Sequence, residues 1–390
     1  MKIALINSIY KPDSRGGAEI IFGSIVAALN QRGHDVFVIA SGRKDQIENI
    51  DGIKIYRLKP LNLFSFLDIN IKPAWQRLIW HVLDVFNLNS YFKIKKILKA
   101  EAPVLVWTHN LKGLGYLTLA AVRRQKIKNI HSLHDVQLAN PSGLILKDEE
   151  QLWRNNNLFI KIYERINRWL FNSPSIVLSP SQWLLDFYTT KKFFLHSQKI
   201  ILPNPVADEI KNSDQQNKTS EPCYLYAGQI EKYKGVEFLL SVWEKFNQGR
   251  LLVAGQGSLL DELKDKYKDN QTIEFLGHIP HQDLGVLFRK VNFTVVPSLC
   301  YENSPTVIYD SFNYGVPVIA ADIGGVAELV KDGFNGYTFI AGDKLSLLNK
   351  LNLSLEHLPN ADKLGQNGRV QASAYNIKKY LDKILLMLKK

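Results

Sequence analysis

Short apolar runs alternate with longer amphipathic segments along almost the whole chain, and this alternation limits the folds that it can adopt. Six runs of the first half have the pattern of strands: KIALIN, DVFVIA, IKIYRL, VLVWTH, NIHSLHD and SIVLSP. Five follow in the second half: CYLYAG, GRLLVAG, TIEFLG, NFTVVPS and PVIAAD. Helical periodicity lies between them, for example over Ile20–Arg32 and Val236–Asn247. The alternation predicts an α/β fold with doubly wound parallel sheets.

The length of 390 residues exceeds what one ordinary hydrophobic core organises, so we expect two domains. The polar stretch 208–222 has no apolar periodicity, and we interpret it as the linker. The sequence thus predicts one Rossmann-like domain over 1–207 and a second over 223–374, facing each other across a cleft.

Composition narrows the class of protein. A content of 46% hydrophobic and 22% charged residues is typical of globular proteins. No run of 18 apolar residues occurs, and the start MKIALINSIY has the pattern of a buried strand instead of a signal peptide. The two cysteines, Cys223 and Cys300, are far apart, which favours a reducing compartment and excludes a disulfide framework. We therefore expect a cytoplasmic protein.

The net charge of +12 belongs to the first half of the chain. Residues 1–205 carry 28 basic and 15 acidic residues, whereas residues 206–390 carry 21 and 22. This asymmetry favours an anionic partner for the first half: nucleic acid, a membrane surface or a phosphorylated acceptor.

The segment 61–100 departs from the alternation. It carries seven aromatic residues followed by four lysines: Phe64, Phe66, Trp75, Trp80, Phe86, Tyr91, Phe92, Lys93, Lys95, Lys96 and Lys99. Aromatic rings beside lysines suit the interfacial zone of an anionic membrane. A helical insertion whose rings pack on the core explains the same pattern, and the sequence leaves both interpretations open.

The stretch PSLCYENSPTVIYDSFNYGVPVIA (297–320) contains an expected helix start. Ser304 is predicted as its N-cap and Pro305 as the first helical residue, with the helix continuing through Tyr314. The N–H groups of Thr306 and Val307 would then favour an anion such as a phosphate.

Two carboxylates flank this helix start. Glu302 precedes it, and Asp310 lies about five residues into the helix, roughly 7 to 8 Å along its axis. Acceptors for hydroxyl groups on both sides of a diphosphate site suit a nucleotide sugar. Taken alone, the two acids are equally well explained as surface residues.

Further loops follow the other strands of the second half. The chain places small or basic residues there: Gly228, Lys232, Lys234, Gly255, Gly257, Gly277, His278 and Ile279. Loops that follow parallel strands open on the same edge of the sheet, where ligands bind in such folds. The ordered set predicts a ligand site at this edge.

With these motifs the chain resembles glycosyltransferase family 4, the retaining group 1 glycosyl transferases of the GT-B fold. The matching segments of the second half are AGQIEKYKGVEFLL, VAGQGSLLDEL, IEFLGHIP, LFRKVNFTVVPS and YENSPTVIYDSFNYGVPVIAADIGGVAELVKDGFNGYTF. In the first half, GGAE, LHD, SPSQWL and LPNPV match. The resemblance also implies that the helical segment 375–390 packs back on the first domain, which would bind the acceptor.

The resemblance implies a role for each matching residue. Glu302 would contact the hexose, and Asp310, where the family has a longer Glu, the nucleotide ribose. Lys234 would bind the diphosphate, while Gln229 stands where the family usually has Arg. Further donor-binding positions are Gly17, Gly277, His278, Ile279, Asn303, Ser304, Thr306 and Val307.

Three residues form the expected catalytic set. His134 would line the sugar near its reacting carbon, beside Glu302 and Lys234. A histidine at a strand end, such as His134 or His109, is also commonly only a satisfied turn residue. Cys300 has no partner base in the sequence, so we do not expect it to act as a nucleophile.

Neither a metal nor a cofactor is expected. No Asp-x-Asp occurs in the chain, so a cation-bridged diphosphate has no evident ligands. A lysine and a helix start would stabilise the departing nucleoside diphosphate instead. The resemblance implies that the acceptor attacks from the face from which the diphosphate leaves.

The predicted function is transfer of a hexose-type sugar from a nucleoside-diphosphate sugar to a hydroxyl of a glycan, lipid-linked or other acceptor. A GT-B sugar-phosphate enzyme, such as a nucleotide-sugar epimerase or phosphorylase, is the alternative. A nucleic-acid-binding protein is disfavoured because no recognised binding module occurs. An NAD-dependent oxidoreductase is disfavoured because no G-x-G-x-x-G follows the first strand.

Overall fold

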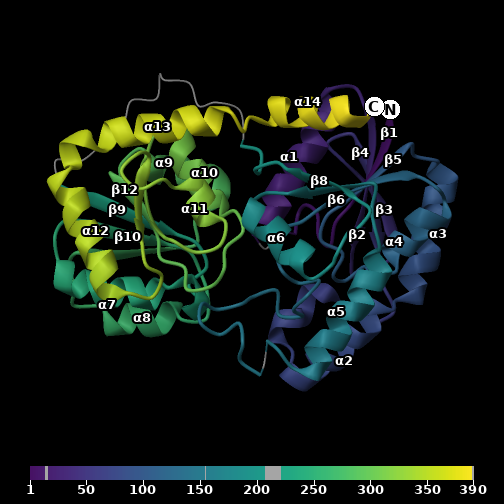
Figure 1. Cartoon of the computed structure of the whole chain (residues 1–390), viewed down its shortest axis with the longest axis horizontal. Helices are drawn as coiled ribbons and strands as arrows, with labels where there is room; N and C mark the ends of the chain where they lie inside the picture. The colour runs from purple at the N-terminus through teal and green to yellow at the C-terminus, as the bar shows by residue number, and fades with distance from the viewer. Residues whose placement is uncertain (14–15, 154, 207–220, 389–390) are drawn as a thin grey trace. The chain divides into compact units, whose positions relative to one another are not determined.

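The computed structural model describes residues 1–13, 16–153, 155–206 and 221–388 (Figure 1). Most of the expected linker 208–222 lies outside these residues. The described chain divides into two compact units. Unit 1 comprises Met1–Leu144, Gln151–Pro203 and Tyr380–Lys390, and unit 2 comprises Ile145–Glu150 and Asn204–Lys379.

Unit 1 contains an eight-stranded sheet in the order β3-β4-β2-β1-β5-β6-β7-β8. All pairs are parallel except the edge pair of β3 and β4. Its strands are β1 (Lys2–Ile6), β2 (Asp35–Ser41), β3 (Gln46–Ile50), β4 (Ile53–Leu58), β5 (Leu105–Thr108), β6 (Lys128–Ser132), β7 (Ile176–Ser179) and β8 (Gln198–Ile201). Its helices are α1 (Gly17–Gln31), η1 (Phe66–Ile71), α2 (Ala74–Val85), α3 (Leu88–Glu101), α4 (Thr118–Arg124), α5 (Leu158–Phe171) and α6 (Gln182–Thr190).

Unit 2 contains a six-stranded parallel sheet in the order β11-β10-β9-β12-β13-β14. The strands are β9 (Cys223–Ala227), β10 (Arg250–Ala254), β11 (Ile273–Gly277), β12 (Phe293–Val296), β13 (Val318–Ala321) and β14 (Gly336–Phe339). The helices are η2 (Lys232–Lys234), α7 (Val236–Phe246), α8 (Leu260–Lys266), η3 (His281–Asp283), α9 (Leu284–Phe288), α10 (Thr306–Asn313), α11 (Val326–Leu329), α12 (Lys344–Glu356), η4 (Leu358–Asn360) and α13 (Ala361–Ser373). The last helix, α14 (Ile377–Leu388), begins in unit 2 and ends in unit 1.

Helices cover both faces of the sheet of unit 2. Apolar residues of α7, α8 and α12 pack with inward-facing residues of the strands in one core, and α9 and α10 pack on the other face (Figure 1). Helix α13 contributes to both cores, through Ala361 and Leu364 at its start and Ala372 near its end. The prediction of two doubly wound α/β domains is confirmed. Three edge strands, β3, β8 and β14, had no counterpart in the predicted set.

The aromatic segment 61–100 contains both buried and exposed rings. Trp80 is fully buried and stacks on Phe64 and Phe66, as expected of a core insertion. Trp75, Phe86 and Phe92 are exposed. Core packing therefore accounts for Trp80 but not for these three exposed rings.

Candidate active site

The loop that follows β9 contacts the loop that follows β12. Gly235 ends the short helix η2 with φ +73°, and a Cβ atom there would lie 1.9 Å from the carbonyl oxygen of Pro297. Only glycine permits this approach and this backbone conformation. The amide of Leu299 donates to the carbonyl of Tyr233 (3.0 Å) and ties the loops together.

This contact brings Lys234 and Glu302 into an ion pair. Lys234 Nζ lies 2.6 Å from Glu302 Oε1, which also accepts from Ser298 Oγ at 2.9 Å. The backbone of Glu302 is held as well, since its carbonyl accepts from the amide of Gly325 (2.7 Å). The structure thus brings together two residues that the sequence places 68 positions apart.

Electrostatics keep Lys234 charged and Cys300 neutral. Burial lowers the pKa of Lys234, but Glu302, with contributions from Cys300 and Tyr233, raises it, and the net pKa lies above the ordinary lysine value, so the side chain stays an ammonium. Burial, together with Glu302, raises the pKa of Cys300 to about 12. Since the thiolate is the reactive form, Cys300 is inert near neutral pH, as the sequence led us to expect.

Helix α10 begins beside this pair, and one detail of its predicted start is wrong. The N-cap is Pro305, with φ −62° and ψ 124°, and no side chain caps the helix. The hydroxyl of Ser304 instead lies 2.5 Å from the hydroxyl of Tyr309, and the Ser304 carbonyl accepts from Asn204 Nδ2 (3.3 Å). The Ser304 side chain therefore does not satisfy the first N–H groups of α10, at Thr306 and Val307.

Asp310 has a partner that sequence reasoning missed. His281 Nε2 lies 2.9 Å from Asp310 Oδ2, and this hydrogen bond raises the pKa of His281. His281 follows the expected Gly277, His278 and Ile279, but the sequence carries no local signal linking it to an acid 29 residues away. His278 is exposed and Ile279 packs in the core beneath.

Gln229 also has a defined environment. Its backbone carbonyl accepts from the hydroxyl of Tyr226 (2.5 Å) and its Oε1 from the hydroxyl of Tyr233 (2.6 Å). The exposed amide nitrogen is the donor that Gln229 can offer to a ligand.

Glycines hold the neighbouring loops in contact. A Cβ atom on Gly255 would lie 1.8 Å from the Gly228 carbonyl oxygen, and one on Gly257 would lie 2.3 Å from the Ile230 carbonyl oxygen. The loops after β9 and β10 therefore meet at one edge of the sheet, as expected of parallel strands.

In unit 1, His134 follows β6 and pairs with His109. His134 Nε2 lies 2.8 Å from His109 Nδ1, and the two rings stack at 5.1 Å. Burial lowers the pKa of His134 to about 4, so the imidazole is neutral at pH 7. It can exchange hydrogen bonds with a ligand, but it is not a cation there.

Gly17 is the first residue of α1. The N-cap, Gly16, has an extended backbone, and its amide donates to Glu19 Oε2 (2.8 Å). Gly17 and His134 belong to unit 1, whereas the other expected site residues belong to unit 2. Among the described residues, no group of three or more His, Cys, Asp or Glu side chains is arranged to hold a metal ion.

Comparison with known proteins identifies the family. The model of the glycosyltransferase family 4 matches residues 15–209, and that of the group 1 glycosyl transferases matches residues 208–371. A protein of the cps region of Klebsiella pneumoniae, uncharacterized, is 22% identical over 84% of this chain and 87% of its own length.

Two solved structures share the fold. Sucrose-phosphate synthase from Thermosynechococcus elongatus has a TM-score of 0.78 at 20% identity and covers 100% of this chain and 98% of its own. HepE of Anabaena, solved in complex with UDP, has a TM-score of 0.71 at 18% identity and covers 100% of both chains. Both neighbours have the GT-B fold, with two α/β domains built on parallel sheets as in this chain. The chain belongs to the group 1 glycosyltransferases of family 4, transferases of the GT-B fold.

Proposed function

We propose that the protein transfers a hexose-type sugar from a nucleoside-diphosphate sugar to a hydroxyl of a glycan, lipid-linked or other acceptor, with retention of configuration and without a metal. The observation that carries the proposal is the cluster of Lys234, Glu302 and Ser298 beside the start of α10. It combines a cation and helix N–H groups for a diphosphate with a carboxylate for sugar hydroxyls.

The donor would lie along the carboxyl edge of the sheet of unit 2. Lys234 and the N–H groups of Thr306 and Val307 would bind the diphosphate, with the amide of Gln229 in place of an Arg. Glu302 would accept from hexose hydroxyls. The loop residues Gly277, His278, Ile279, Asn303 and Ser304 would surround the nucleotide.

Asp310 would accept from the ribose. One of its oxygens is engaged by His281, so the other oxygen is the acceptor for a ribose hydroxyl. From unit 1, Gly17 and the neutral His134 would contact the diphosphate and the sugar.

In the proposed reaction, the bond from the sugar carbon to the phosphate oxygen breaks and a bond to the acceptor oxygen forms on the same face. The acceptor proton passes to the departing phosphate oxygen. Lys234 and the start of α10 stabilise the negative charge that develops on the leaving group. The protonated Cys300 does not compete as a nucleophile, and the Lys234 ammonium offsets the charge of Glu302.

We also propose that the protein works at the cytoplasmic face of a membrane, in polysaccharide or glycolipid biosynthesis. In the described part of the chain, no helix has both the length and the apolar character needed to cross a bilayer. A peripheral contact would present lipid-linked acceptors to the strongly basic first half of the chain.

A thermal-shift panel of UDP-, GDP-, ADP- and dTDP-sugars tests the donor site. Ligands that bind only the folded state raise the unfolding midpoint. We expect the sugars of one nucleotide to raise the unfolding midpoint in a metal-free buffer. Uridine nucleotides are tested first because HepE was solved in complex with UDP. The sugar nucleotide should lose part of its shift in Glu302→Gln. No shift with any nucleotide sugar contradicts the proposal, and donor turnover that needs no acceptor favours an epimerase or phosphorylase.

A further inference from the structure

Helix α2 turns an apolar stripe toward solvent. Its exposed large apolar residues recur every three or four positions: Trp75, Leu78, Ile79, Val82, Leu83 and, just after the helix, Phe86. This spacing covers one face of a helix over three turns. Trp75 is 63% exposed and Val82 is 51% exposed, so the face that usually packs on a core lies outside.

The opposite face of α2 is anchored in the domain. Trp80 is buried and donates from Nε1 to the carbonyl of Phe64 (2.8 Å). The buried carboxylate of Asp84 accepts from the amide of Gly113 at 3.0 and 3.1 Å. These contacts fix the rotation of the helix, so the exposure of its apolar stripe is built into the fold.

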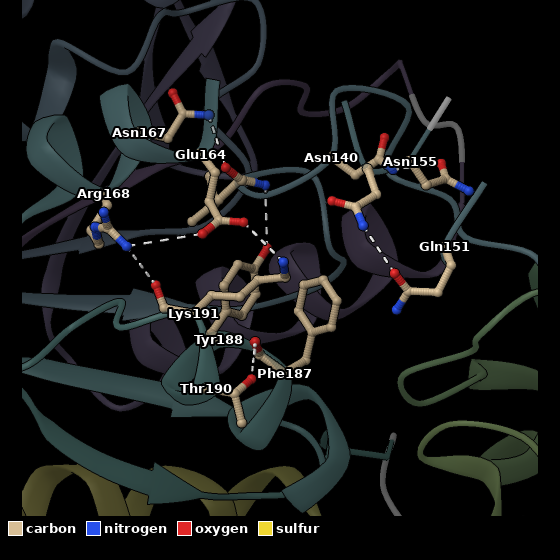
Figure 2. Close-up of polar contacts among 12 residues, drawn as sticks. Asn140, Gln151, Asn155, Glu164, Asn167, Arg168, Phe187, Tyr188, Thr190 and Lys191 are labelled. Carbon is tan, nitrogen blue, oxygen red and sulfur yellow. Dashed lines mark hydrogen bonds and ion pairs between the residues drawn. The ribbon is translucent and has the colours of Figure 1, made fainter. Parts of the chain in front are cut away.

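Helix α5 has the same arrangement. Leu158, Phe159, Ile162 and Trp169 are exposed along one side. Figure 2 shows how polar contacts hold the other side: Glu164 pairs with Lys191 (2.9 Å), and Arg168 donates to the carbonyl of Lys191 (2.9 Å).

Asn167 completes the anchoring of α5. Its Nδ2 donates to the carbonyl of Leu138 at 2.9 Å, and the residue is fully buried (Figure 2). Glu164, Asn167 and Arg168 thus hold one side of α5 against the domain, and the apolar stripe of the helix is exposed to solvent.

The two stripes line a common groove. Leu78 and Val82 of α2 and Phe159 and Ile162 of α5 belong to its walls, which enclose about 510 Å³ open to solvent. Both helices belong to unit 1, and Figure 1 draws them side by side. We call these ten exposed apolar residues with their groove the α2–α5 surface.

The exposed charged residues of α2 and α5 are all basic. The only acids in α2 and α5 are Asp84 and Glu164, and both are engaged on the inner faces. Arg77, Lys161 and Arg165 are exposed on the same two helices.

A second groove continues the surface along α3 and α4. Exposed Phe92 and Trp169 line it together with Lys95, Arg123 and Arg124, and it encloses about 1240 Å³ open to solvent. Apolar side chains ringed by cations, with tryptophan at the edges, are the pattern of proteins that lie in the headgroup zone of an anionic bilayer. A second copy of the chain would bring like charges together on this face, so a bilayer is the more complementary occupant.

We propose that the α2–α5 surface docks the enzyme on an anionic membrane, with its apolar stripes inserted at headgroup depth and its cations on lipid phosphates. The inference rests on the proposed function in one respect: the bilayer would supply the lipid-linked acceptor. Docking itself is a property of unit 1 and needs no donor.

Vesicle co-sedimentation tests the docking. The full chain should bind phosphatidylglycerol-containing vesicles at low salt and bind pure phosphatidylcholine vesicles more weakly. Added salt should weaken binding to the anionic vesicles. The variant R77Q/K161Q/R165Q should bind anionic vesicles roughly 100-fold more weakly, since each cation near such a surface contributes about 1 kcal/mol. The variant V82D/I162D should lose at least about 10-fold by removing apolar insertion.

Matched controls lie in unit 2. K264Q/K266Q/K268Q removes three exposed lysines, and V370D places an acid at an exposed valine; both should bind vesicles like the wild type. The docking variants change exposed residues only, so they should keep the wild-type circular dichroism spectrum and the thermal shift with the donor nucleotide.

Three outcomes overturn the proposal: no binding of the wild type to anionic vesicles at low salt, equal binding by the docking variants, or a wild-type dimer that V82D/I162D converts to a monomer without any vesicle binding. The last would make the surface a contact between copies. A missing thermal shift with every nucleotide sugar would refute the proposed function and leave the vesicle result standing.

Discussion

Replacing Lys234 with methionine tests the role of the Lys234–Glu302 pair in stability and in donor binding, because methionine keeps the unbranched apolar stem of lysine and removes the ammonium. Nζ and Oε1 are 2.6 Å apart, and the two side chains are only 27% and 13% exposed. Loss of one partner from a fully buried ion pair costs about 3–5 kcal/mol. Glu302 keeps its bond from Ser298 and some solvent access, so we expect Lys234→Met to lower the free energy of unfolding by about 1–3 kcal/mol.

The same change should weaken nucleotide binding. A hydrogen bond to a charged group contributes about 1.5–3 kcal/mol. If Lys234 holds the diphosphate as proposed, loss of its ammonium should weaken binding of UDP, or of whichever nucleotide the panel selects, by roughly 10- to 150-fold. Isothermal titration calorimetry in metal-free buffer measures the affinity, and urea unfolding measures the stability.

Lys232→Met is the matched control for this experiment. Lys232 lies two residues away on the same short helix and is exposed. It forms no ion pair with any residue that the structure describes. Equal weakening of nucleotide binding by both variants would mean that only the local charge matters. Unchanged binding in Lys234→Met would refute the assignment of Lys234 to the diphosphate.

The stability cost of Lys234→Met should not vary between pH 6 and 9. The pKa of Lys234 is raised in the folded state, so the stability contributed by the pair is fully present below the ordinary lysine value. It is lost only at still higher pH, as the pH passes the folded pKa. A cost that disappears between pH 6 and 9 would contradict this.

Two further predictions concern buried or paired acids. Burial raises the pKa of Asp84 to about 7, so the free energy of unfolding of the wild type should fall as pH rises from about 4 to 7. Asp84→Asn should remove this fall and add up to about 4 kcal/mol to the free energy of unfolding at pH 7.5. Urea unfolding across this pH range measures both effects. Equal pH slopes for the two proteins would show that Asp84 does not titrate there. His281→Gln should lower the free energy of unfolding below pH 6.5 by less than about 1 kcal/mol, because the His281 side chain is 41% exposed. The difference from the wild type should vanish as pH rises through the raised pKa of His281. A constant difference between pH 5 and 8 would contradict the ion pair.

Periodicity was enough to predict the central strands of both sheets but not their edges. Central parallel strands are buried on both faces and appear as continuous apolar runs. The edge strands β3 and β8 contain only exposed and partly buried positions over five and four residues, so QIENI and QKII resemble loops. Strand β14 is short and begins with Gly336, which weakens the strand pattern although most of its residues are buried.

The missed details of the site depend on partners that are distant in sequence. Ser304 is a favourable N-cap residue by type, but a tyrosine one turn into the helix engages its hydroxyl and Pro305 takes the cap position. The link between His281 and Asp310 arises only when the fold brings η3 next to α10. The sequence did not reveal the α2–α5 surface for the same reason. Trp75 and Trp80 are the same residue type five positions apart, and only the neighbours that the fold supplies decide which of them is buried.

The pairing of Lys234 with Glu302 has a consequence for the order of donor contacts. A diphosphate that engages the Lys234 ammonium replaces Glu302 as its counter-charge, while Ser298 still donates to the carboxylate. Under the proposed function, Glu302 would then be a stronger acceptor for the sugar hydroxyls, so diphosphate binding would prepare the sugar site. In Glu302→Gln the carboxylate no longer competes for the ammonium. Nucleoside diphosphate alone should therefore bind at least as tightly as to the wild type, whereas the affinity added by the attached sugar should fall. Equal weakening of both ligands would show that Glu302 supports the loop and does not contact the sugar.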